Sequence, residues 1–513
     1  MKKIFYFTAL AVLGLLPAGC YEDKGNYDYT DIGDVTLDVA SGIYEYNVML
    51  GDRLTIPMKV TSEVAEAQLE YIWERNEGGS FIELGTGKDF DRNVGPDEYF
   101  PSYGEYRIRL KAVRTYGERV AEAYSPLILL TVGGESGLMV LHGNDTESDV
   151  GVIQDPDFTV RAGVDIQKKV VHNLYSTANG EKLPGKGVLA VQHHASSGTI
   201  ETNKVYIVTD RGAVYAGSAG FRKEGDYADM FLSVPGAPPL YKGKPEAFGF
   251  YMTSKALIDD GDVFVLNGIY NFKFNVKTGI TGLSNYKLSK YSYLDTFAYV
   301  FDMNSRRFVM VSLQGTTPTW MSTYSSPDGP FDVNDVKADL LYFDRGGAAG
   351  HFLGVFEEDD GDIFIGEVNF AATNQPGDYF AHAKYDIGKL PAFGSAKFHA
   401  FGSASSMCYY ATDSGIYQYA VLGSGGTTTG RKLMMGVNEL PISGEITMMK
   451  MMRSRMTGNS AYQHRDKMLI VGTYENGVGT LHAIVLDIIS GSAVSHKTFT
   501  GFGRIYDANL KSL

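Results

Sequence analysis

Residues 34–133 alternate apolar and polar positions with a period of two, in short runs. The runs are rich in β-branched and aromatic residues, and Gly, Pro or Asp separates them. This pattern is typical of half-buried strands joined by tight turns. Strands are expected over residues 35–39, 54–60, 69–74, 81–84, 106–113 and 123–132. Six or seven strands in about 100 residues predict a β-sandwich.

Two stretches indicate how the core of this sandwich is filled. Trp73 falls on a central strand with Tyr71 on the same face, where it would fill the space between two sheets. Tyr106, Ile108 and Leu110 alternate with two arginines, so we expect these three to point inward and the arginines to face water. Tyr106 is also placed like the corner tyrosine of immunoglobulin-type sandwiches. An immunoglobulin-like domain is therefore expected.

Residues 137–513 contain repeated strand–turn–strand patterns. Residues 205–216 align with 408–419, and Asp-Asp-Gly-Asp at 259–262 recurs at 359–362. The offsets, 203 and 100 residues, are near multiples of about 50, the length of one four-stranded propeller blade. We therefore predict a β-propeller of about seven blades, with six or eight left open. A long β-sandwich array is the alternative, and the glycine-rich residues 133–137 mark the domain boundary.

The N-terminal segment has a different pattern. Two lysines precede an apolar run, residues 4–16, that is too short to span a membrane, so residues 1–19 are predicted to be a signal peptide. The run ends in Pro17-Ala18-Gly19-Cys20, which resembles a lipobox except that Pro17 replaces the usual leucine. Cys20 is therefore the predicted lipidation site. The alternative is a simple small-residue cleavage site with an incidental cysteine.

The residues that follow the cysteine predict where the protein is exported. Residues 20–33 are polar, lack periodicity and are predicted to be a tether. Glu22 and Asp23 resemble the export signal that sends Bacteroidetes lipoproteins to the cell surface. We expect a lipid-anchored protein of the outer membrane that faces the cell exterior. The alternative is that these acidic residues only keep the tether solvated.

Composition narrows the fold class and the partners. The chain holds 34 Tyr, 28 Phe and 60 Gly, and long helical periodicity is hard to find, which predicts an all-β protein. The formal net charge of −14 argues against binding to nucleic acid. Cys408 is the only other cysteine, so no intrachain disulfide can form once Cys20 is acylated.

The motifs that could carry chemistry are weak. The two Asp-Asp-Gly-Asp sequences offer oxygen ligands to calcium, but Asp-Gly is a preferred hairpin turn, which is the interpretation we favour. His193 and His194 would point to opposite faces of a strand, which argues against a shared metal ion. Residues 423–430 lack the lysine of a phosphate loop and are predicted to be a surface loop. No catalytic residue, metal site or cofactor is predicted.

Two groups of side chains are candidates for binding. A methionine cluster fits either an adaptable surface or a buried strand, and we favour the strand; its members are Met448, Met449, Met451, Met452 and Met456. Trp320 and Tyr324 lie in a predicted loop over residues 315–330 and are the predicted ligand or partner contact. Packing against a neighbouring blade is the alternative for Trp320.

With these features the chain resembles the PKD-like family of Bacteroidetes lipoproteins. The resemblance rests on residues 20–29, on Tyr71-Ile72-Trp73 and on Gly104-Glu105-Tyr106 with its alternating strand, and it covers the first quarter of the chain best. It implies an accessory lipoprotein of loci that encode TonB-dependent transporters of the starch-utilisation (SusC/SusD-like) type. Oligopeptides are the implied cargo, with glycans as the alternative, and no catalytic residues are implied.

The sequence therefore predicts a non-enzymatic surface lipoprotein whose propeller binds nutrient, transporter or both. Two other functions stay open. One is a propeller hydrolase or lyase that acts on surface glycans or peptides in its central funnel. The other is a structural subunit that braces the transporter.

Overall fold

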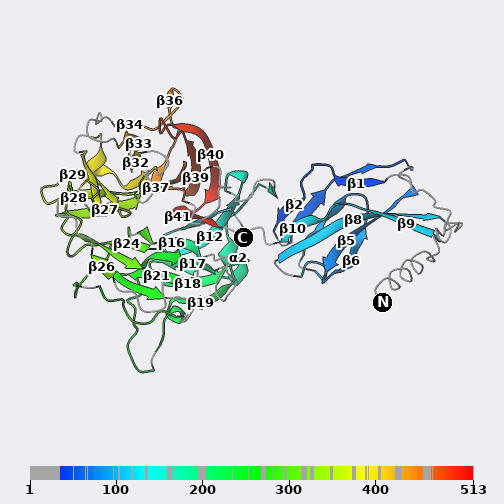
Figure 1. The fold of residues 1–513 in the computed structure, drawn as a ribbon, viewed down its shortest axis with the longest axis horizontal. Helices are drawn as coiled ribbons and strands as arrows, with labels where there is room; N and C mark the ends of the chain where they lie inside the picture. Colours follow the sequence, from blue (N-terminus) through cyan, green and yellow to red (C-terminus); the bar gives the residue numbers. More distant parts are fainter. Residues whose placement is uncertain are drawn as a thin grey trace, which may run out of the picture. The chain divides into compact units, whose positions relative to one another are not determined.

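The computed structural model describes residues 35–511 apart from internal gaps, the longest of which are 194–203, 313–320, 422–429 and 454–463. Regular structure in the described residues is almost entirely β-strand, so the all-β prediction is confirmed (Figure 1). The helical elements that the structure describes are α2 (Leu174–Asn179) and the short 3₁₀ turns η2 (Pro156–Phe158), η3 (Tyr227–Met230) and η4 (Phe393–Ser395). Within the described part of the chain, no helix is long and apolar enough to cross a membrane.

The chain divides into two compact units, each described by itself. The first comprises the described residues up to Gly42, Ile56–Phe90 and Arg109–Pro126, and the second comprises Ile43–Thr55, Asp91–Ile108 and Leu127–Leu513.

The described part of the first unit includes three antiparallel strand pairs. They are β1 (Thr36–Val39) with β4 (Met58–Thr61), β5 (Glu70–Glu77) with β6 (Ser80–Thr86), and the second half of β8 (Gly104–Tyr116) with β9 (Arg119–Tyr124). The β8 and β5 strands of two of these pairs are also neighbours in one sheet. Trp73 is buried, as predicted, and packs edge-on against Phe90 at 5.1 Å between ring centroids. Trp73 thus anchors the apolar interior of this unit.

Arg109 departs from the expectation that it faces water. Its guanidinium lies 3.5 Å from the Phe81 ring centroid and 4.0 Å from that of Tyr124, and its Nε donates to Glu74 at 2.8 Å. The aromatic rings of Phe81 on β6 and Tyr124 on β9 cover the arginine, and the cation–π contacts and the ion pair compensate for the lost water. Arg107 is exposed as expected, and Ile108 and Leu110 are buried.

Proline divides two of the predicted strands. The predicted strand 54–60 is two strands, β3 (Arg53–Ile56) and β4, on either side of Pro57, and the predicted strand 123–132 is β9 and β10 (Ile128–Val132), separated at Pro126. Proline cannot donate to a strand ladder, which explains both interruptions. The second unit also contains β2 (Glu45–Val48), which pairs in parallel with β10 and β13 (Val164–Ile166), and all but the first residue of β7 (Phe90–Asn93), which pairs with β3.

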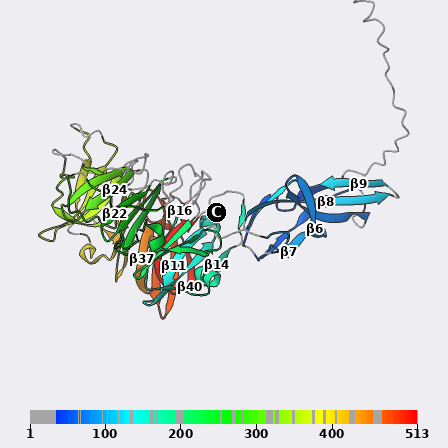
Figure 2. The same cartoon turned by 90° about the horizontal axis from the view of Figure 1, so that it is seen from below.

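Seven sheets follow one another along the rest of the described chain, and almost all of the neighbouring strands within them pair antiparallel (Figures 1 and 2). In chain order their strands are β11 (Gly137–Gly143), β12 (Glu147–Gln154), β14 (Lys169–Val171) and β15 (Leu183–Pro184); β16 (Gly187–His193), β17 (Lys204–Thr209), β18 (Gly212–Gly217) and β19 (Lys223–Asp226); β20 (Pro245–Tyr251), β21 (Ser254–Asp259) and β22 (Asp262–Leu266); β23 (Tyr293–Leu294), β24 (Phe297–Asp302), β25 (Arg307–Ser312) and β26 (Met321–Thr323); β27 (Ala338–Arg345), β28 (His351–Glu358), β29 (Ile363–Asn369) and β30 (Ala381–Asp386); β31 (Phe398–Phe401), β32 (Met407–Thr412), β33 (Gly415–Ala420) and β34 (Arg431–Lys432); and β37 (Glu445–Met451), β38 (Met468–Glu475), β39 (Val478–Leu486) and β40 (Ala493–Phe502), with β35 (Met434–Met435) and β36 (Asn438–Glu439) at the edge.

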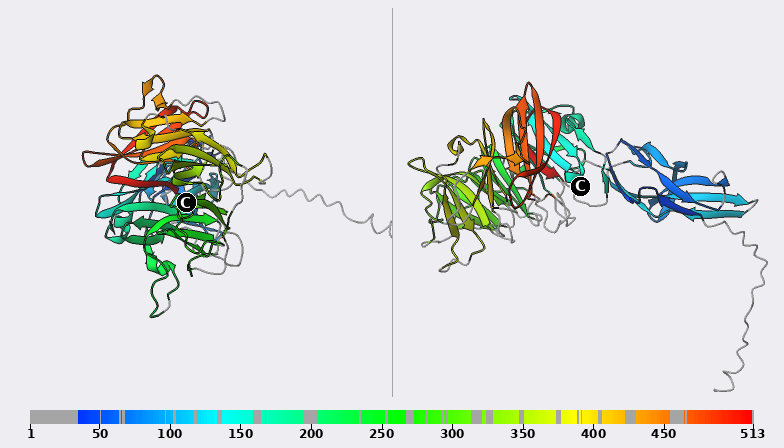
Figure 3. Two further views of the ribbon diagram at one scale, coloured as in Figure 1. Left: turned by 90° about the vertical axis from the view of Figure 1, so that its left-hand side faces the viewer. Right: turned by 90° about the horizontal axis from the view of Figure 1, so that it is seen from above.

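The last strand of the chain belongs to the first sheet. β41 (Arg504–Lys511) pairs antiparallel with β11, with Leu138 opposite Leu510 and Val140 opposite Ala508. β41 also contacts β16 and β37, and the first strands of successive sheets, β16, β20, β23, β27, β31 and β37, contact one another in chain order. Figure 3 shows the red C-terminal strands beside the first sheet.

The predicted sequence repeats are hairpins of these sheets. Residues 205–216 and 408–419 form the β17–β18 and β32–β33 hairpins, which lie four sheets apart. The two Asp-Asp-Gly-Asp sequences join β21 to β22 and β28 to β29, two sheets apart. Both offsets therefore correspond to about 50 residues per sheet, as the repeat length predicts.

Apolar clusters of described residues fill the spaces between successive sheets. Tyr206 of the second sheet packs with Phe264 of the third, for example. Clusters of this kind lie at each of the seven junctions, including one in which Leu138 of the first sheet packs with Met448 of the seventh. Burial of both faces explains why the middle strands are almost continuously apolar.

Candidate functional site

Several predicted site residues lie outside the described residues. Cys20 precedes residue 35, and Trp320 and Tyr324 fall in gaps around β26. Their predicted roles in lipid attachment and in ligand or partner contact remain predictions. Met456 and His194 also lie in gaps.

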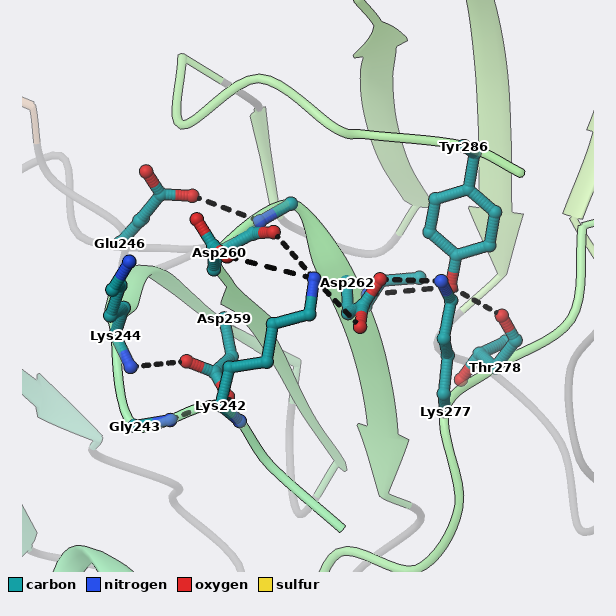
Figure 4. Close-up of polar contacts among 12 residues, drawn as sticks. Lys242, Gly243, Lys244, Glu246, Asp259, Asp260, Asp262, Lys277, Thr278 and Tyr286 are labelled. Atoms are coloured by element: carbon teal, nitrogen blue, oxygen red, sulfur yellow. Dashed lines mark hydrogen bonds and ion pairs between the residues drawn. The ribbon is translucent and has the colours of Figure 1, made fainter. Parts of the chain in front are cut away.

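The turn at residues 259–262 is a structural hairpin turn (Figure 4). Asp259 pairs with Asp262 across a two-residue turn in which Asp260 and Gly261 have φ of +46° and +80°, the left-handed conformations of a type I′ turn. The fully buried Asp259 carboxylate accepts hydrogen bonds from the backbone N–H groups of residues 242, 243 and 244. The turn interpretation is confirmed.

Lysine side chains surround the other two carboxylates of this turn. Lys242 Nζ lies 3.7 Å from Asp260 Oδ2 and 3.1 Å from Asp262 Oδ2, and Lys277 also pairs with Asp262. Figure 4 shows both lysines directed at the turn. Because these ammonium groups already neutralise the carboxylates, the arrangement is that of an ion-pair network and not of a calcium loop.

The same hydrogen bond between an aspartate and an upstream backbone N–H recurs in the two neighbouring sheets, and it was not among the predicted features. Asp210 and Asp302 each accept a hydrogen bond from the backbone N–H of an upstream lysine, at 2.8 Å and 2.7 Å. The donors are Lys186 for Asp210 and Lys287 for Asp302. Lys244 donates in the same way to Asp259. A signal was present: in these three sheets an aspartate ends or directly follows the second strand, and a lysine precedes the first.

Other candidates occupy the apolar interior. The described methionines of the cluster are all buried, and all lie on or next to β37: Met448, Met449, Met451 and Met452. This confirms the buried-strand interpretation for the described part of the cluster. His193 is buried and stacks on Phe250, at 4.6 Å between ring centroids. Cys408 is a buried free thiol whose pKa is raised by burial, so it is not a reactive nucleophile.

One polar network ties the first, second and seventh sheets together. Asp507 on β41 accepts from Lys450 Nζ of β37 at 2.7 Å and from the Ala190 backbone N–H of β16 at 3.0 Å. Asn509, also on β41, donates to the Ala190 carbonyl oxygen at 2.7 Å. These hydrogen bonds fix the C-terminal strand β41 to β16 and to β37. The polar groups of the network satisfy one another's hydrogen-bonding capacity.

A second network joins the fifth, sixth and seventh sheets at Arg453. Its guanidinium contacts Asp344 at 2.9 Å and Asp466 at 3.1 Å, and donates to the Phe401 carbonyl oxygen at 2.7 Å. Burial alone would lower the pKa of Arg453, but the attraction of Asp344 and Asp466 raises it above its ordinary value. The arginine stays charged and holds three segments together.

A third polar group lies at one end of the fifth sheet. His351, Glu367 and His382 come from β28, β29 and β30, and one potential ligand atom of each lies within 4.8 Å of the other two. His351 Nδ1 is 2.6 Å from Glu367 Oε1, and the Tyr385 hydroxyl donates to Glu367 Oε2 at 2.7 Å. Two imidazoles and a carboxylate are a donor set that can hold a metal ion. None of these residues was among the predicted site residues.

Among the comparisons with known proteins, a family match is found for the N-terminal third of the chain. Residues 20–187 match the model of the PKD-like family, which supports the predicted resemblance over that part. No curated protein matches the chain significantly.

Solved structures give only distant likenesses. A chain in the crystal structure of BBS1N in complex with ARL6DN is 11% identical, with a TM-score of 0.27 over 71% of this chain and 90% of that one. The extracellular domain of a putative one-component system from B. thetaiotaomicron is 10% identical, with a TM-score of 0.26 over 90% of this chain and 85% of that one. Both TM-scores are too low to establish a shared fold.

Proposed function

We propose that this chain is a lipid-anchored outer-membrane protein, facing the cell exterior, that acts as a non-enzymatic accessory or binding component of a TonB-dependent nutrient-uptake system. One observation carries the proposal: the match to the PKD-like family begins at residue 20, the cysteine at which the signal-peptide pattern predicts that the mature chain starts. The domain order that goes with it is a signal peptide over 1–19, a tether over 20–33, a sandwich over 34–133 and a propeller over 137–513.

Several features of the second unit support the propeller. Seven sheets of similar length follow one another, and apolar clusters lie at all seven junctions, including that between the seventh and the first. The C-terminal strand β41 completes the first sheet, which is how a ring of blades joins its two ends. A ring of this kind presents loops from every blade on each face, and such loops are common binding surfaces.

Lipidation is tested first in cells of the source organism. The unaltered chain should incorporate labelled palmitate and be digested by protease added to intact cells. Cys20→Ser should lose the label and leave the outer-membrane fraction. Label retained in Cys20→Ser, or protection of the unaltered chain from external protease, would contradict the anchored surface location.

The partner is tested by gentle extraction of the lipidated protein in mild detergent. A SusC/SusD-like transporter pair should co-purify, and an oligopeptide mixture, with glycans as the alternative cargo, should bind. Trp320→Ala and Tyr324→Ala should weaken one of these interactions if they are contact residues. Recovery of no transporter, and binding of neither cargo class, would reject the accessory role.

The rival function is a propeller hydrolase or lyase. Two acids, Asp344 on β27 and Asp507 on β41, are held by the cations Arg453 and Lys450 respectively, and ion-paired carboxylates of this kind are suited to holding strands together. Binding is therefore the function that the geometry favours. A screen for peptide and glycan turnover separates the two functions, since turnover abolished by Asp344→Asn in a folded variant would favour the enzyme.

A further inference from the structure

We propose that His351, Glu367 and His382 form a binding site for a divalent transition-metal ion of the Zn²⁺ type. One ligand atom of each residue lies within 4.8 Å of the other two. Zinc–ligand distances of about 2.0–2.2 Å in a tetrahedral site place ligand atoms roughly 3.3–3.6 Å apart. Small side-chain rotations therefore suffice to bring all three atoms to one ion.

Strand register brings the first two ligands to one face of the fifth sheet. Leu353 on β28 lies directly opposite Glu367 on β29. His351 precedes Leu353 by two residues on the same strand, so its side chain points to the same face. This face continues into the apolar cluster between the fifth and sixth sheets, through Leu353, Val355 and Ile365. The polar pair lies where that cluster ends.

A β-bulge supplies the third ligand. Glu367 pairs with Ala383 but Val368 pairs with Ala381, so His382 is an extra residue on β30. In a regular strand His382 would point away from the face that carries Glu367, because neighbouring residues alternate. Bulges redirect side chains and are frequent beside functional sites. Here the His382 ring lies edge-on to that of His351, at 4.9 Å between ring centroids.

The carboxylate is held in place from outside the triad. The Tyr385 hydroxyl donates to Glu367 Oε2, which leaves Oε1 directed at His351. Hydrogen bonds that orient metal-binding carboxylates are a regular feature of metal sites.

The donor set selects the class of ion. Two imidazole nitrogens and one carboxylate oxygen suit Zn²⁺ and its neighbours in the first transition row, whereas Ca²⁺ and Mg²⁺ prefer oxygen ligands alone. Three protein ligands leave a fourth position for water or for a group of a bound molecule. His382 is exposed, while His351 and Glu367 are largely covered, so the ion has a path from solvent.

The test uses the full chain, purified in mild detergent and freed of metal with a chelator. Titration with Co²⁺ should give the visible absorption of a tetrahedral site, and Zn²⁺ should displace it at one ion per chain. Calorimetry should then give the Zn²⁺ affinity. Failure of the unaltered chain to bind either ion would overturn the proposal.

Variants locate the site. His382→Gln and Glu367→Gln should each weaken Zn²⁺ binding by at least about 100-fold, and Tyr385→Phe by about 10-fold, because loss of an orienting partner alone costs 10–100-fold. His382 is exposed, so its replacement leaves the core intact. Circular dichroism checks folding, and Glu367→Gln, which keeps an oxygen for Tyr385, is the second variant.

The matched control is His464→Gln. His464 is also partly covered and paired with a carboxylate, Asp157, at 3.3 Å, but on the described residues that pair is not part of a three-ligand group. It should leave Zn²⁺ affinity unchanged. Unchanged affinity in both triad variants, or an equal loss in His464→Gln, would assign the bound ion to other groups and overturn the proposal.

Discussion

Two hairpins of the second unit carry the same turn sequence but place their polar groups at opposite ends. The β21–β22 hairpin has a buried network at its Asp-Asp-Gly-Asp turn, where Asp259 accepts three backbone hydrogen bonds. The β28–β29 hairpin has an exposed turn, in which Asp359 pairs with Arg306 alone of the residues that the structure describes, and its polar group is His351 and Glu367 at the other end. Identical turn residues therefore do not imply an identical role.

Even the turns themselves differ by one residue in register. In the first hairpin Asp259 pairs with Asp262. In the second, the Glu358 N–H donates to the Asp362 carbonyl oxygen, so three residues form the loop, and Gly361 has φ of +89°. Two-residue and three-residue loops that end in a left-handed glycine are both common in hairpins. In the first hairpin, residues 242–244, just before β20, donate their backbone N–H groups to Asp259. Among the described residues, no such segment donates backbone N–H groups to the aspartates of the second turn from outside its hairpin.

Removal of the buried aspartate should have the largest effect. Asp259→Ala leaves three backbone N–H groups without their acceptor, and we expect the free energy of unfolding to fall by about 3 kcal/mol. Asp359→Ala, in the exposed turn, should change it by about 0.5 kcal/mol or less. Urea unfolding of both variants measures the difference. Equal losses would mean that the two turns have the same structural role.

Zinc should stabilise the second hairpin by a similar amount. At a Zn²⁺ concentration of 100 times the dissociation constant, binding linkage adds about 2.7 kcal/mol to the free energy of unfolding. Asp259→Ala should keep this increment, because distant sites act independently. Glu367→Gln should lose it. Thermal unfolding with and without Zn²⁺ measures the increment, and a Zn²⁺-dependent gain retained in Glu367→Gln would contradict this distinction between the hairpins.

A smaller effect is expected from the tyrosine beside each hairpin. Tyr286 is buried and donates to the Thr278 carbonyl oxygen at 2.6 Å, next to the first hairpin. Tyr286→Phe and Tyr385→Phe should each lower the free energy of unfolding by about 1 kcal/mol. Only the cost of Tyr385→Phe should grow when Zn²⁺ is present. A zinc-dependent cost for Tyr286→Phe would contradict the assignment of metal binding to the second hairpin.

Much of the strand pattern could be predicted because it is local. Period-two alternation located most strands of residues 34–132, and repeated turn residues located the paired hairpins. β2 and β7 were missed because each is only four residues long and mixes polar with apolar positions. The splits at Pro57 and Pro126 follow from the missing proline N–H and were open to prediction.

The candidate metal site could not be predicted in the same way. His351, Glu367 and His382 are separated by 16 and 15 residues, and they meet only because of strand register and a one-residue bulge. Neither register nor bulge position can be read from alternation alone. The spacing, about one strand and one turn between successive ligands, is the only sequence signal, and many unrelated pairs share it.

The smallest expected effect concerns pH and the first hairpin. Glu246 on β20 accepts a hydrogen bond from the Gly261 N–H at 3.1 Å. Burial raises the pKa of Glu246, and the nearby Asp260 adds to the rise, while the Gly261 hydrogen bond opposes it. The folded-state pKa of Glu246 lies above the unfolded value. At pH values around and between these two pKa values, the folded protein therefore binds more protons than the unfolded chain does. Stability from this group is therefore lost as pH rises through the folded-state pKa.

Glu246→Gln removes that loss while an amide oxygen still accepts from Gly261. The variant should unfold at nearly the same urea concentration as the unaltered chain at pH 4 and at a slightly higher one at pH 7. Glu357→Gln, on an exposed position of the second hairpin, is the matched control and should not alter the pH profile. A Glu246→Gln variant that is less stable at pH 7 than at pH 4, relative to the unaltered chain, would show that the charged carboxylate stabilises the first turn, as Asp259 does, and that burial is not the dominant influence at this position.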